Sequence, residues 1–90
     1  MSITLQLHPF LRQFSGGQKT IEVKGRTVGE CLADLESRFP DIRPHLYDEQ
    51  GKLADLWDIY INSDSSYPEQ LTMPVKDGDE LIIIALVHGG

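Results

Sequence analysis

Apolar and polar residues alternate in three short stretches of the chain, which is the pattern of a strand with one buried face. The stretches are residues 3–7 (ITLQL), 20–23 (TIEV) and 57–61 (WDIYI). Pro9 is expected to end or bulge the first strand, and the glycine pair at 16–17 marks a turn before the second. The first two strands are therefore expected to form a hairpin with a long connection.

A helical period replaces this alternation at residues 27–39 (TVGECLADLESRF). Thr27 and Glu30 have the spacing of a capping box, which marks the start of a helix. Apolar residues then recur at steps of three and four and share one face: Val28, Cys31, Leu32, Leu35 and Phe39. Pro40 is expected to end the helix, because proline forces the preceding residue out of the helical region. The pattern predicts one amphipathic helix of about three turns.

The connecting segments carry weaker patterns. Residues 40–56 are punctuated by two prolines and are expected to contain a short strand or a helical turn. Residues 62–68 (NSDSSYP) predict a turn-rich loop, and residues 71–75 (LTMPV) alternate weakly around a proline, which favours an edge strand or a loop. Residues 76–79 (KDGD) predict a tight turn.

Residues 81–86 (LIIIAL) are apolar at every position, which is typical of a strand covered on both faces at the centre of a sheet. Such a strand pairs most naturally with the first strand, parallel to it. The element order predicts an α+β fold, with one main helix packed on one face of a mixed sheet of four to five strands. This is the β-grasp, or ubiquitin-like, arrangement. It is expected to take up residues 1–90 as one domain with a flexible C-terminal tail at 87–90.

The charge and composition of the chain limit the kinds of molecule that such a domain is expected to bind. Residues 1–45 hold six Lys/Arg and five Asp/Glu, whereas residues 46–90 hold two and nine. Because an acidic surface repels phosphate, nucleic acid is not expected as a partner. Either a basic protein partner or solubility alone accounts for the charge. Neither a signal peptide nor an apolar run of about 20 residues is present, so no membrane segment is expected. The single cysteine favours a cytoplasmic location.

Chemistry is expected at the end of the sequence, where Val87, His88, Gly89 and Gly90 follow the apolar strand. Two glycines carry no side chains, so this tail is thin enough to enter a narrow active site in another protein. The α-carboxylate of Gly90 is then the reactive group, while Gly89, His88 and Val87 line the partner's active site. ATP can activate a carboxylate as an adenylate, which a sulfur donor converts to a thiocarboxylate. The alternatives are a chance ending and a simply solvent-exposed His88.

Residues 74–90 (PVKDGDELIIIALVHGG) resemble the C-terminal signature of the MoaD/ThiS family of ubiquitin-like sulfur carriers. In that family a DGDE turn, here Asp77–Glu80, leads into an apolar strand and ends in Gly-Gly. The helix at 27–39 and the strand end at 60–62 also fit, so the resemblance covers nearly the whole chain. It implies a thiocarboxylate on Gly90 and an E1-like adenylyltransferase of the MoeB/ThiF kind that uses ATP. It also implies a carrier that binds no cofactor and is not itself an enzyme.

The resemblance leaves the pathway open. Many members end in Pro-Pro-Val-Ala-Gly-Gly, whereas residues 85–88 here are Ala-Leu-Val-His, which points to a different acceptor enzyme. The chain is also longer than thiamine-type carriers, mainly through residues 40–56 and 62–72. This favours a carrier of the molybdopterin type or the cysteine-biosynthesis type over the thiamine type. Of these two, the small subunit of molybdopterin synthase, with the large subunit as acceptor, is the first interpretation, and a carrier for cysteine or another sulfur metabolite is the second. A ubiquitin-like modifier conjugated through Gly90 and a plain interaction module are the remaining alternatives.

Four further residues are candidates for partner docking. Phe10 and Phe14 belong to an apolar cluster near the first turn, which either docks partner enzymes or packs in the core. Asp79 and Glu80 either serve the turn alone or steer a basic partner surface toward the tail. The sequence does not choose between these interpretations.

A metal site and a reactive cysteine are not expected. Cys31 lies on the apolar face of the helix, so it is expected to be a small buried hydrophobe rather than a persulfide site. His8 and His45 lie far apart in the sequence, with no second cysteine to complete a site. Four acids lack a regular ligand spacing and are expected to form a solvated face: Asp48, Glu49, Asp55 and Asp58.

Overall fold

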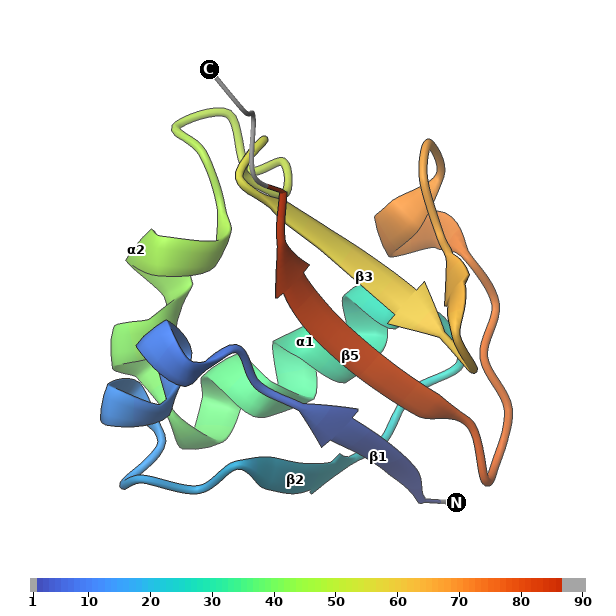
Figure 1. Ribbon diagram of the computed structural model, residues 1–90, viewed down its shortest axis with the longest axis horizontal. Coiled ribbons are helices and arrows are strands. Elements are labelled where there is room, and N and C mark those ends of the chain that lie inside the picture. The colour runs from blue at the N-terminus through green and yellow to red at the C-terminus, as the bar shows by residue number, and fades with distance from the viewer. Residues whose placement is uncertain (1, 87–90) are drawn as a thin grey trace.

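The computed structural model describes residues 2–86, and its five strands form one mixed sheet (Figure 1). The strands are β1 (Ile3–Gln6), β2 (Thr20–Val23), β3 (Trp57–Ile61), β4 (Asp64–Ser65) and β5 (Glu80–Ala85). They lie in the order β2-β1-β5-β3-β4, with β5 parallel to β1 and all other neighbours antiparallel. The predicted β-grasp arrangement is confirmed, as is the central place of the last strand beside the first.

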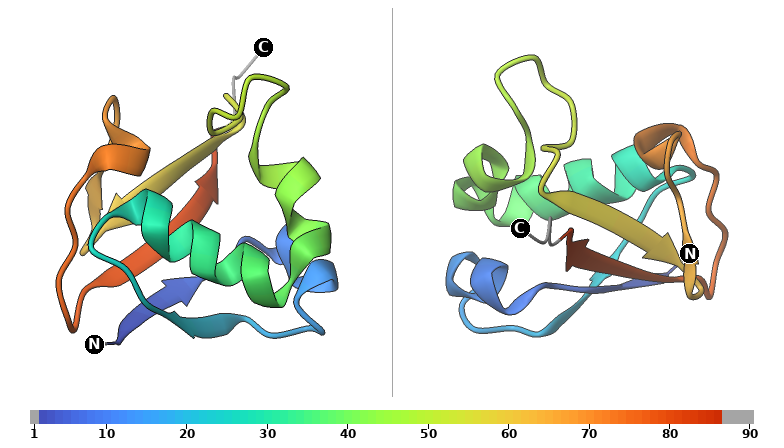
Figure 2. Two further views of the ribbon diagram at one scale, coloured as in Figure 1. Left: turned by 180° about the vertical axis from the view of Figure 1, so that it is seen from behind. Right: turned by 45° about the horizontal axis from the view of Figure 1, so that its top comes forward.

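Helix α1 (Val28–Arg38) packs across one face of the sheet (Figure 2). Its start is capped as predicted, since Thr27 Oγ1 accepts a hydrogen bond from Glu30 N at 3.1 Å. Glu30 Oε1 in turn accepts a hydrogen bond from Arg26 N at 2.9 Å. The apolar stripe of the helix is buried against the sheet: Val28, Cys31, Leu32 and Leu35.

The core lies between α1 and the sheet. Leu81 and Ile83 of β5 are at most 1% exposed, and they point to the same face as α1. Leu81 stands beside Leu5 of β1, and Ile83 stands opposite Ile59 of β3, so three strands contribute to one apolar layer. Burial of this surface is the main favourable contribution to folding, at about 25 cal/mol for each Å².

Within residues 2–86, no helix covers the other face of β5 (Figures 1 and 2). Ile82 and Ile84 are only half-buried, so the prediction that residues 81–86 are covered on both faces is wrong. The neighbours of Ile82 in the sheet are polar or partly polar: Gln6 on β1 and Tyr60 on β3. An apolar run fits a doubly covered strand, but it fits equally well a strand that keeps apolar side chains on an open face.

The connecting segments are helical more often than the sequence predicts. Residues Pro9–Phe14 form the 3-10 helix η1, where an ended or bulged strand was expected. The uncertain stretch after α1 contains the 3-10 helix η2 (Pro40–Ile42) and α2 (Arg43–Leu46), and the 3-10 helix η3 (Gln70–Thr72) lies before β5. Within residues 2–86, no helix combines the length and the apolar character needed to cross a lipid bilayer.

Candidate functional site

Leu86 directly follows β5, and this end of the strand, termed here the tail end, has a fixed position. Strand β3 pairs with β5 as far as Ala85, and Leu86 N donates a hydrogen bond to Leu56 O at 2.6 Å. The backbone direction at Leu86 is therefore set by its neighbours. The predicted tail residues lie beyond it, outside the described residues: Val87, His88, Gly89 and Gly90.

Residues 47–56 form a small hairpin beside the tail end (Figures 1 and 2). Tyr47 and Leu53 pair across the hairpin, and Leu53 is buried beneath it. The Asp48 carboxylate stabilises the turn, since Oδ1 accepts hydrogen bonds from the backbone N of residues 50 and 52 at 2.8 and 3.0 Å. Leu56, 49% exposed, leaves an apolar side chain on the surface at this end.

Aromatic rings gather near the same end of the sheet. The ring of His8 lies 5.2 Å from that of Trp57, edge to face, and Trp57 Nε1 donates a hydrogen bond to His45 O at 2.6 Å. The His45 ring stacks on Phe14 at 4.2 Å, and Phe10 meets both of these rings edge-on. Phe14 packs against the core, whereas Phe10 is 46% exposed. Of the two phenylalanines predicted to dock partner enzymes, Phe10 therefore has the larger accessible surface for that role.

Asp58 differs from the other acids near the tail end because it is only 4% exposed. Its Oδ1 accepts hydrogen bonds from Ile59 N at 2.8 Å and from Gln70 Nε2 at 3.1 Å, and its Oδ2 accepts one from Ser65 Oγ at 2.5 Å. The expectation that Asp58 belongs to a solvated acidic face is therefore wrong. The other three acids of that set are exposed, as expected: Asp48, Glu49 and Asp55.

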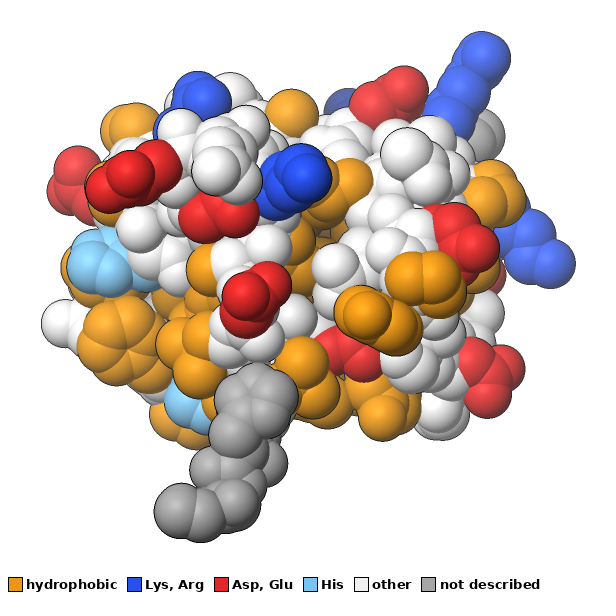
Figure 3. All heavy atoms as spheres, turned by 90° about the horizontal axis from the view of Figure 1, so that it is seen from above, with side chains coloured by type: hydrophobic (Ala, Val, Ile, Leu, Met, Phe, Trp, Pro, Cys, Tyr) orange, Lys and Arg blue, Asp and Glu red, His pale blue; other side chains and the backbone are white. Residues whose placement is uncertain are grey.

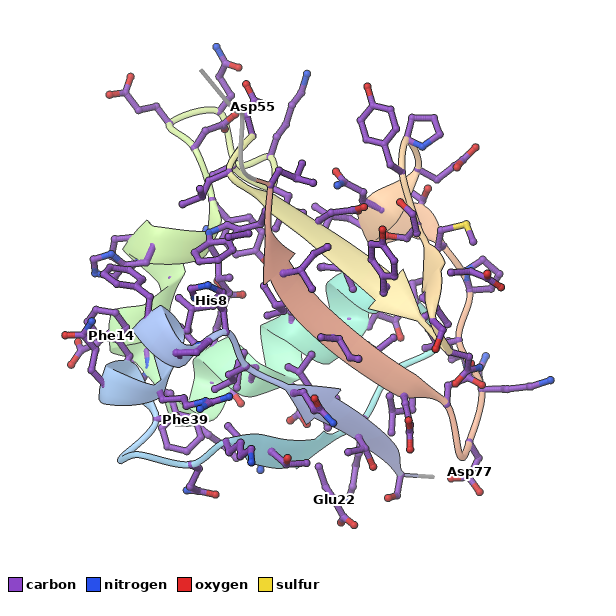
Figure 4. The ribbon with its side chains drawn as sticks, viewed as in Figure 1. His8, Phe14, Glu22, Phe39, Asp55 and Asp77 are labelled. Carbon is purple, nitrogen blue, oxygen red and sulfur yellow. The ribbon has the colours of Figure 1, made fainter. Side chains whose placement is uncertain are left out.

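The turn at Asp77–Glu80 lies at the opposite end of β5, termed here the turn end (Figure 4). Asp79 is 6% exposed, and its carboxylate accepts hydrogen bonds from Asn62 Nδ2 and Lys76 N, both at 2.9 Å. These two hydrogen bonds, the one from Asn62 first, hold the pKa of Asp79 below its ordinary value. Asp79 therefore serves the turn, and its burial leaves little carboxylate surface for the docking role considered for it. Glu80 is exposed but lies at the same distant end.

Cys31 is fully buried in the core. Burial, reinforced by the nearby carboxylates of Asp34 and Glu30, raises the pKa of the Cys31 thiol to about 11. The thiol is therefore protonated at neutral pH and is a poor nucleophile, in line with its expected role as a small hydrophobe. Within residues 2–86, His, Cys, Asp and Glu side chains do not form any group of three or more that could hold a metal ion.

Two residues at the tail end were missed by the sequence analysis as parts of a candidate site. Trp57 was assigned only to a strand, and Tyr67, now 70% exposed, only to a loop. A signal for Trp57 was present, because antiparallel pairing of residues 57–61 with the last strand brings residue 57 opposite residue 85. Tyr67 had no such signal, since its place depends on how the loop after β4 folds back.

Comparisons with known proteins bear on the whole chain. The sequence matches the ThiS family over residues 6–90. The sulfur carrier protein CysO of Mycobacterium tuberculosis is 34% identical over 93 residues, which cover all of both chains. A chain in the crystal structure of the Amycolatopsis orientalis BexX/CysO complex is 38% identical, with a TM-score of 0.86 over 98% of this chain and 99% of that one. Ubiquitin-related modifier 1 of Encephalitozoon cuniculi is 34% identical over 77% of this chain and 76% of that protein.

The matches confirm the resemblance drawn from residues 74–90 and the ubiquitin-like fold. The family match includes both the tail end and the turn end of β5, because it runs from Gln6, the last residue of β1, to Gly90. On this basis the chain belongs to the ThiS family, as a small sulfur carrier of the ThiS/CysO type that acts with partner enzymes and is not itself an enzyme.

Proposed function

We propose that the chain carries sulfur as a thiocarboxylate on Gly90. An E1-like adenylyltransferase transfers AMP from ATP to the carboxylate of Gly90 and releases pyrophosphate. A sulfur donor then attacks the acyl carbon, AMP leaves, and the thiocarboxylate forms. The thiocarboxylate sulfur is a soft nucleophile that forms a bond to an electrophilic carbon of the acceptor and displaces a leaving group from it. Hydrolysis of the resulting thioester then breaks the acyl carbon–sulfur bond, leaves the sulfur on the acceptor and regenerates the carboxylate of Gly90. The partner enzymes supply all the catalytic groups, so the carrier needs only to present its tail.

The tail end of β5 is the observation that carries this proposal. Leu86 is held by its hydrogen bond to Leu56, and four residues follow it, the last two of them glycines. A tail without side chains at its tip, attached to a rigid strand, suits insertion into a narrow active site. Exposed Leu56, whose carbonyl accepts the hydrogen bond from Leu86, provides apolar surface at its base, where an enzyme that takes up the tail makes contact.

We propose cysteine or another sulfur metabolite as the destination of the sulfur, with molybdopterin second. This reverses the order of the two interpretations of the sequence, in which the small subunit of molybdopterin synthase came first. The reversal is supported by the CysO relatives, which match the chain over its full length. Within the described residues, the hairpin at 47–56 accounts for part of the extra length, and it adds contact surface at the tail end.

The test is the intact mass of the chain after incubation with an E1-like adenylyltransferase, ATP and a sulfide source. The expected result is a mass increase equal to the exchange of one oxygen for sulfur, with no increase when ATP is left out. Removal of Gly90 is expected to abolish the exchange without changing the melting temperature, because the hydrophobic core is formed by residues between Ile3 and Ala85. A full-length chain that gains no sulfur under these conditions contradicts the proposal.

A ubiquitin-like modifier is the second candidate, and the match to ubiquitin-related modifier 1 favours it. The same activated Gly90 would then form an isopeptide bond with lysines of target proteins. Incubation of the tagged chain in cell extract with ATP distinguishes the two functions. Adducts that resist reducing agents and vanish without Gly90 support the modifier, whereas transfer of sulfur to an activated serine or to a pterin precursor supports the carrier and names its acceptor.

A further inference from the structure

A hollow of about 490 Å³ lies directly beside the tail end. It is lined by Asp55, Asp58, Ser65, Tyr67 and Leu86, so the last described residue of the chain forms part of its wall. Figure 3 looks onto this end of the molecule and shows hydrophobic and acidic side chains around its centre, with most Lys and Arg side chains near the margin. Figure 4 places Asp55 where β5 ends.

Among residues 2–86, no Lys or Arg side chain forms a salt bridge with the negative charge in the hollow. The three donors to the Asp58 carboxylate are a backbone amide, an amide side chain and a hydroxyl, and all of them are neutral. Among residues 2–86 the salt bridges are Arg38–Asp34 and Arg43–Glu36, both on the helical side of the fold. A carboxylate buried without a cation is costly, and pairing with a cation from another molecule lowers that cost.

Asp58 also keeps room for one more donor. A carboxylate can accept about four hydrogen bonds, and three are in place. The free position belongs to Oδ2, which otherwise accepts only from Ser65 Oγ. Asp55 is exposed at the rim and offers a second carboxylate to the same incoming cation.

The rest of the lining is aromatic and aliphatic. Tyr67 is 70% exposed, and its backbone N donates a hydrogen bond to Ser65 Oγ at 3.2 Å, which ties it to the Asp58 network. Leu86 adds an aliphatic surface. A guanidinium group stacks on aromatic rings, forms several hydrogen bonds in one plane and has an apolar stem, whereas an ammonium group is compact and strongly hydrated. The lining therefore fits arginine better than lysine.

We propose that the hollow receives an arginine side chain of the enzyme that adenylates Gly90. This inference rests on the proposed function and adds a contact that orients the enzyme on the carrier. Four residues separate Leu86 from the chain end, and four extended residues span at most about 14 Å. An arginine seated against Leu86 thus holds the enzyme surface within reach of the carboxylate, and the tail enters the active site from a defined direction.

The chemical identity of the ligand is tested by NMR titration of the full ¹⁵N-labelled chain with N-acetylarginine amide. The matched probe is N-acetylcitrulline amide, which has nearly the same shape and no charge. We expect chemical-shift changes at Asp55, Ser65 and Tyr67 with arginine only, and their loss in Asp55→Asn. Absence of these changes, or equal changes with citrulline, overturns the proposal.

The role in activation is tested by the steady-state kinetics of adenylation. Asp55→Asn is expected to raise the KM for the carrier about tenfold with little change in kcat, because a charge pair across the interface is lost. Tyr67→Ala is expected to raise KM as well, and Tyr67→Phe to restore it. Asp64→Asn removes the same charge from an exposed site outside the hollow and serves as the control. Failure of the wild-type chain to be adenylated contradicts the proposed function. If the wild-type chain is adenylated normally and Asp55→Asn has the same KM, the arginine contact is wrong while the proposed function stands.

Discussion

The two ends of β5 differ in how their polar groups are satisfied. At the turn end the chain satisfies itself: Asp79 is hydrogen-bonded by Asn62 and Lys76, and Ser2 N donates to Asp77 Oδ1 at 2.5 Å. At the tail end, the acids of the hollow lack a cation among the described residues. Large apolar side chains there are also exposed, and Tyr67 is the most accessible of them.

The turn end of β5 therefore contributes mainly to the stability of the fold, and the tail end contributes mainly to the binding of a partner. A polar network in which every donor and acceptor is paired fixes the local structure. It leaves few unpaired groups on the surface that a partner could bind. Unbalanced carboxylates and exposed apolar side chains cost stability in the free chain, and a partner that covers them gains affinity. The DGDE motif, which carries the family resemblance most clearly, therefore belongs to the end that builds the fold.

The largest effect is expected from shortening the side chains of β5 on its two faces. Ile83, 1% exposed, packs between α1 and the sheet, so Ile83→Ala is expected to lower the free energy of unfolding by about 3 kcal/mol. Ile84 is half-buried on the open face, and Ile84→Ala is expected to cost about 1 kcal/mol. Urea unfolding followed by circular dichroism measures both values. Equal losses would mean that the open face near the tail end is as much a part of the core as the covered face.

A smaller loss of stability is expected when the turn end is disrupted. Asp79→Ala leaves Asn62 Nδ2 and Lys76 N without their acceptor, at a cost of about 2 kcal/mol. Because the turn end is remote from the tail, the KM and kcat of adenylation are expected to stay at wild-type values where the variant is folded. Denaturant titration and adenylation kinetics on the same preparation check both parts. A raised KM in the folded variant would contradict the separation of the two ends.

The same carboxylate predicts a dependence on acid. The pKa of Asp79 is lowered by folding, so its contribution to stability is fully present above the unfolded-state value of about 3.9. The contribution is lost as the pH falls through the lower pKa of the folded state. Asp79→Asn removes this group, and its unfolding free energy is expected to fall less steeply than that of the wild type between pH 5 and the acid limit of about pH 2. If the free energies of unfolding of the two proteins fell in parallel with pH, the pKa of Asp79 would not be lowered by its hydrogen bonds and the prediction would be wrong.

The sequence predicted the elements with strong local signals. Thr27 and Glu30 marked the helix start, and the alternating residues of β1, β2 and β3 gave the strands, because each of these signals arises within a few residues. The prediction that both faces of β5 are covered was wrong, since a uniformly apolar run has no periodicity that identifies the open face. Whether a second layer exists depends on the number of helices in the whole fold.

The candidate site was predicted in its chemistry but not in its surroundings. Two terminal glycines after an apolar strand indicate a reactive tail from local pattern alone. The burial of Asp58 depends instead on Ser65 and Gln70, which follow it by seven and twelve residues and fold back over β3. Contacts of this kind are made by loops, whose course is set by the whole fold. The sequence therefore shows Asp58 only as one acid among several.

The smallest effect is expected from Glu80, the exposed acid at the turn end for which a steering role was considered. Leu86 at the tail end lies six residue steps further along the chain, a distance of about 20 Å at the rise of a β-strand. This is about twice the Debye length at 0.1 M salt, so the Glu80 charge is largely screened from an enzyme bound around Leu86. Glu80→Gln is expected to change the KM for adenylation by less than about twofold, against about tenfold for Asp55→Asn. Both variants remove one negative charge, and their kinetics should be compared at 0.05 and 0.3 M salt. An equal rise in KM for the two would mean that the enzyme senses the net charge of the chain, and the contrast between the two ends of β5 would then have no part in recognition.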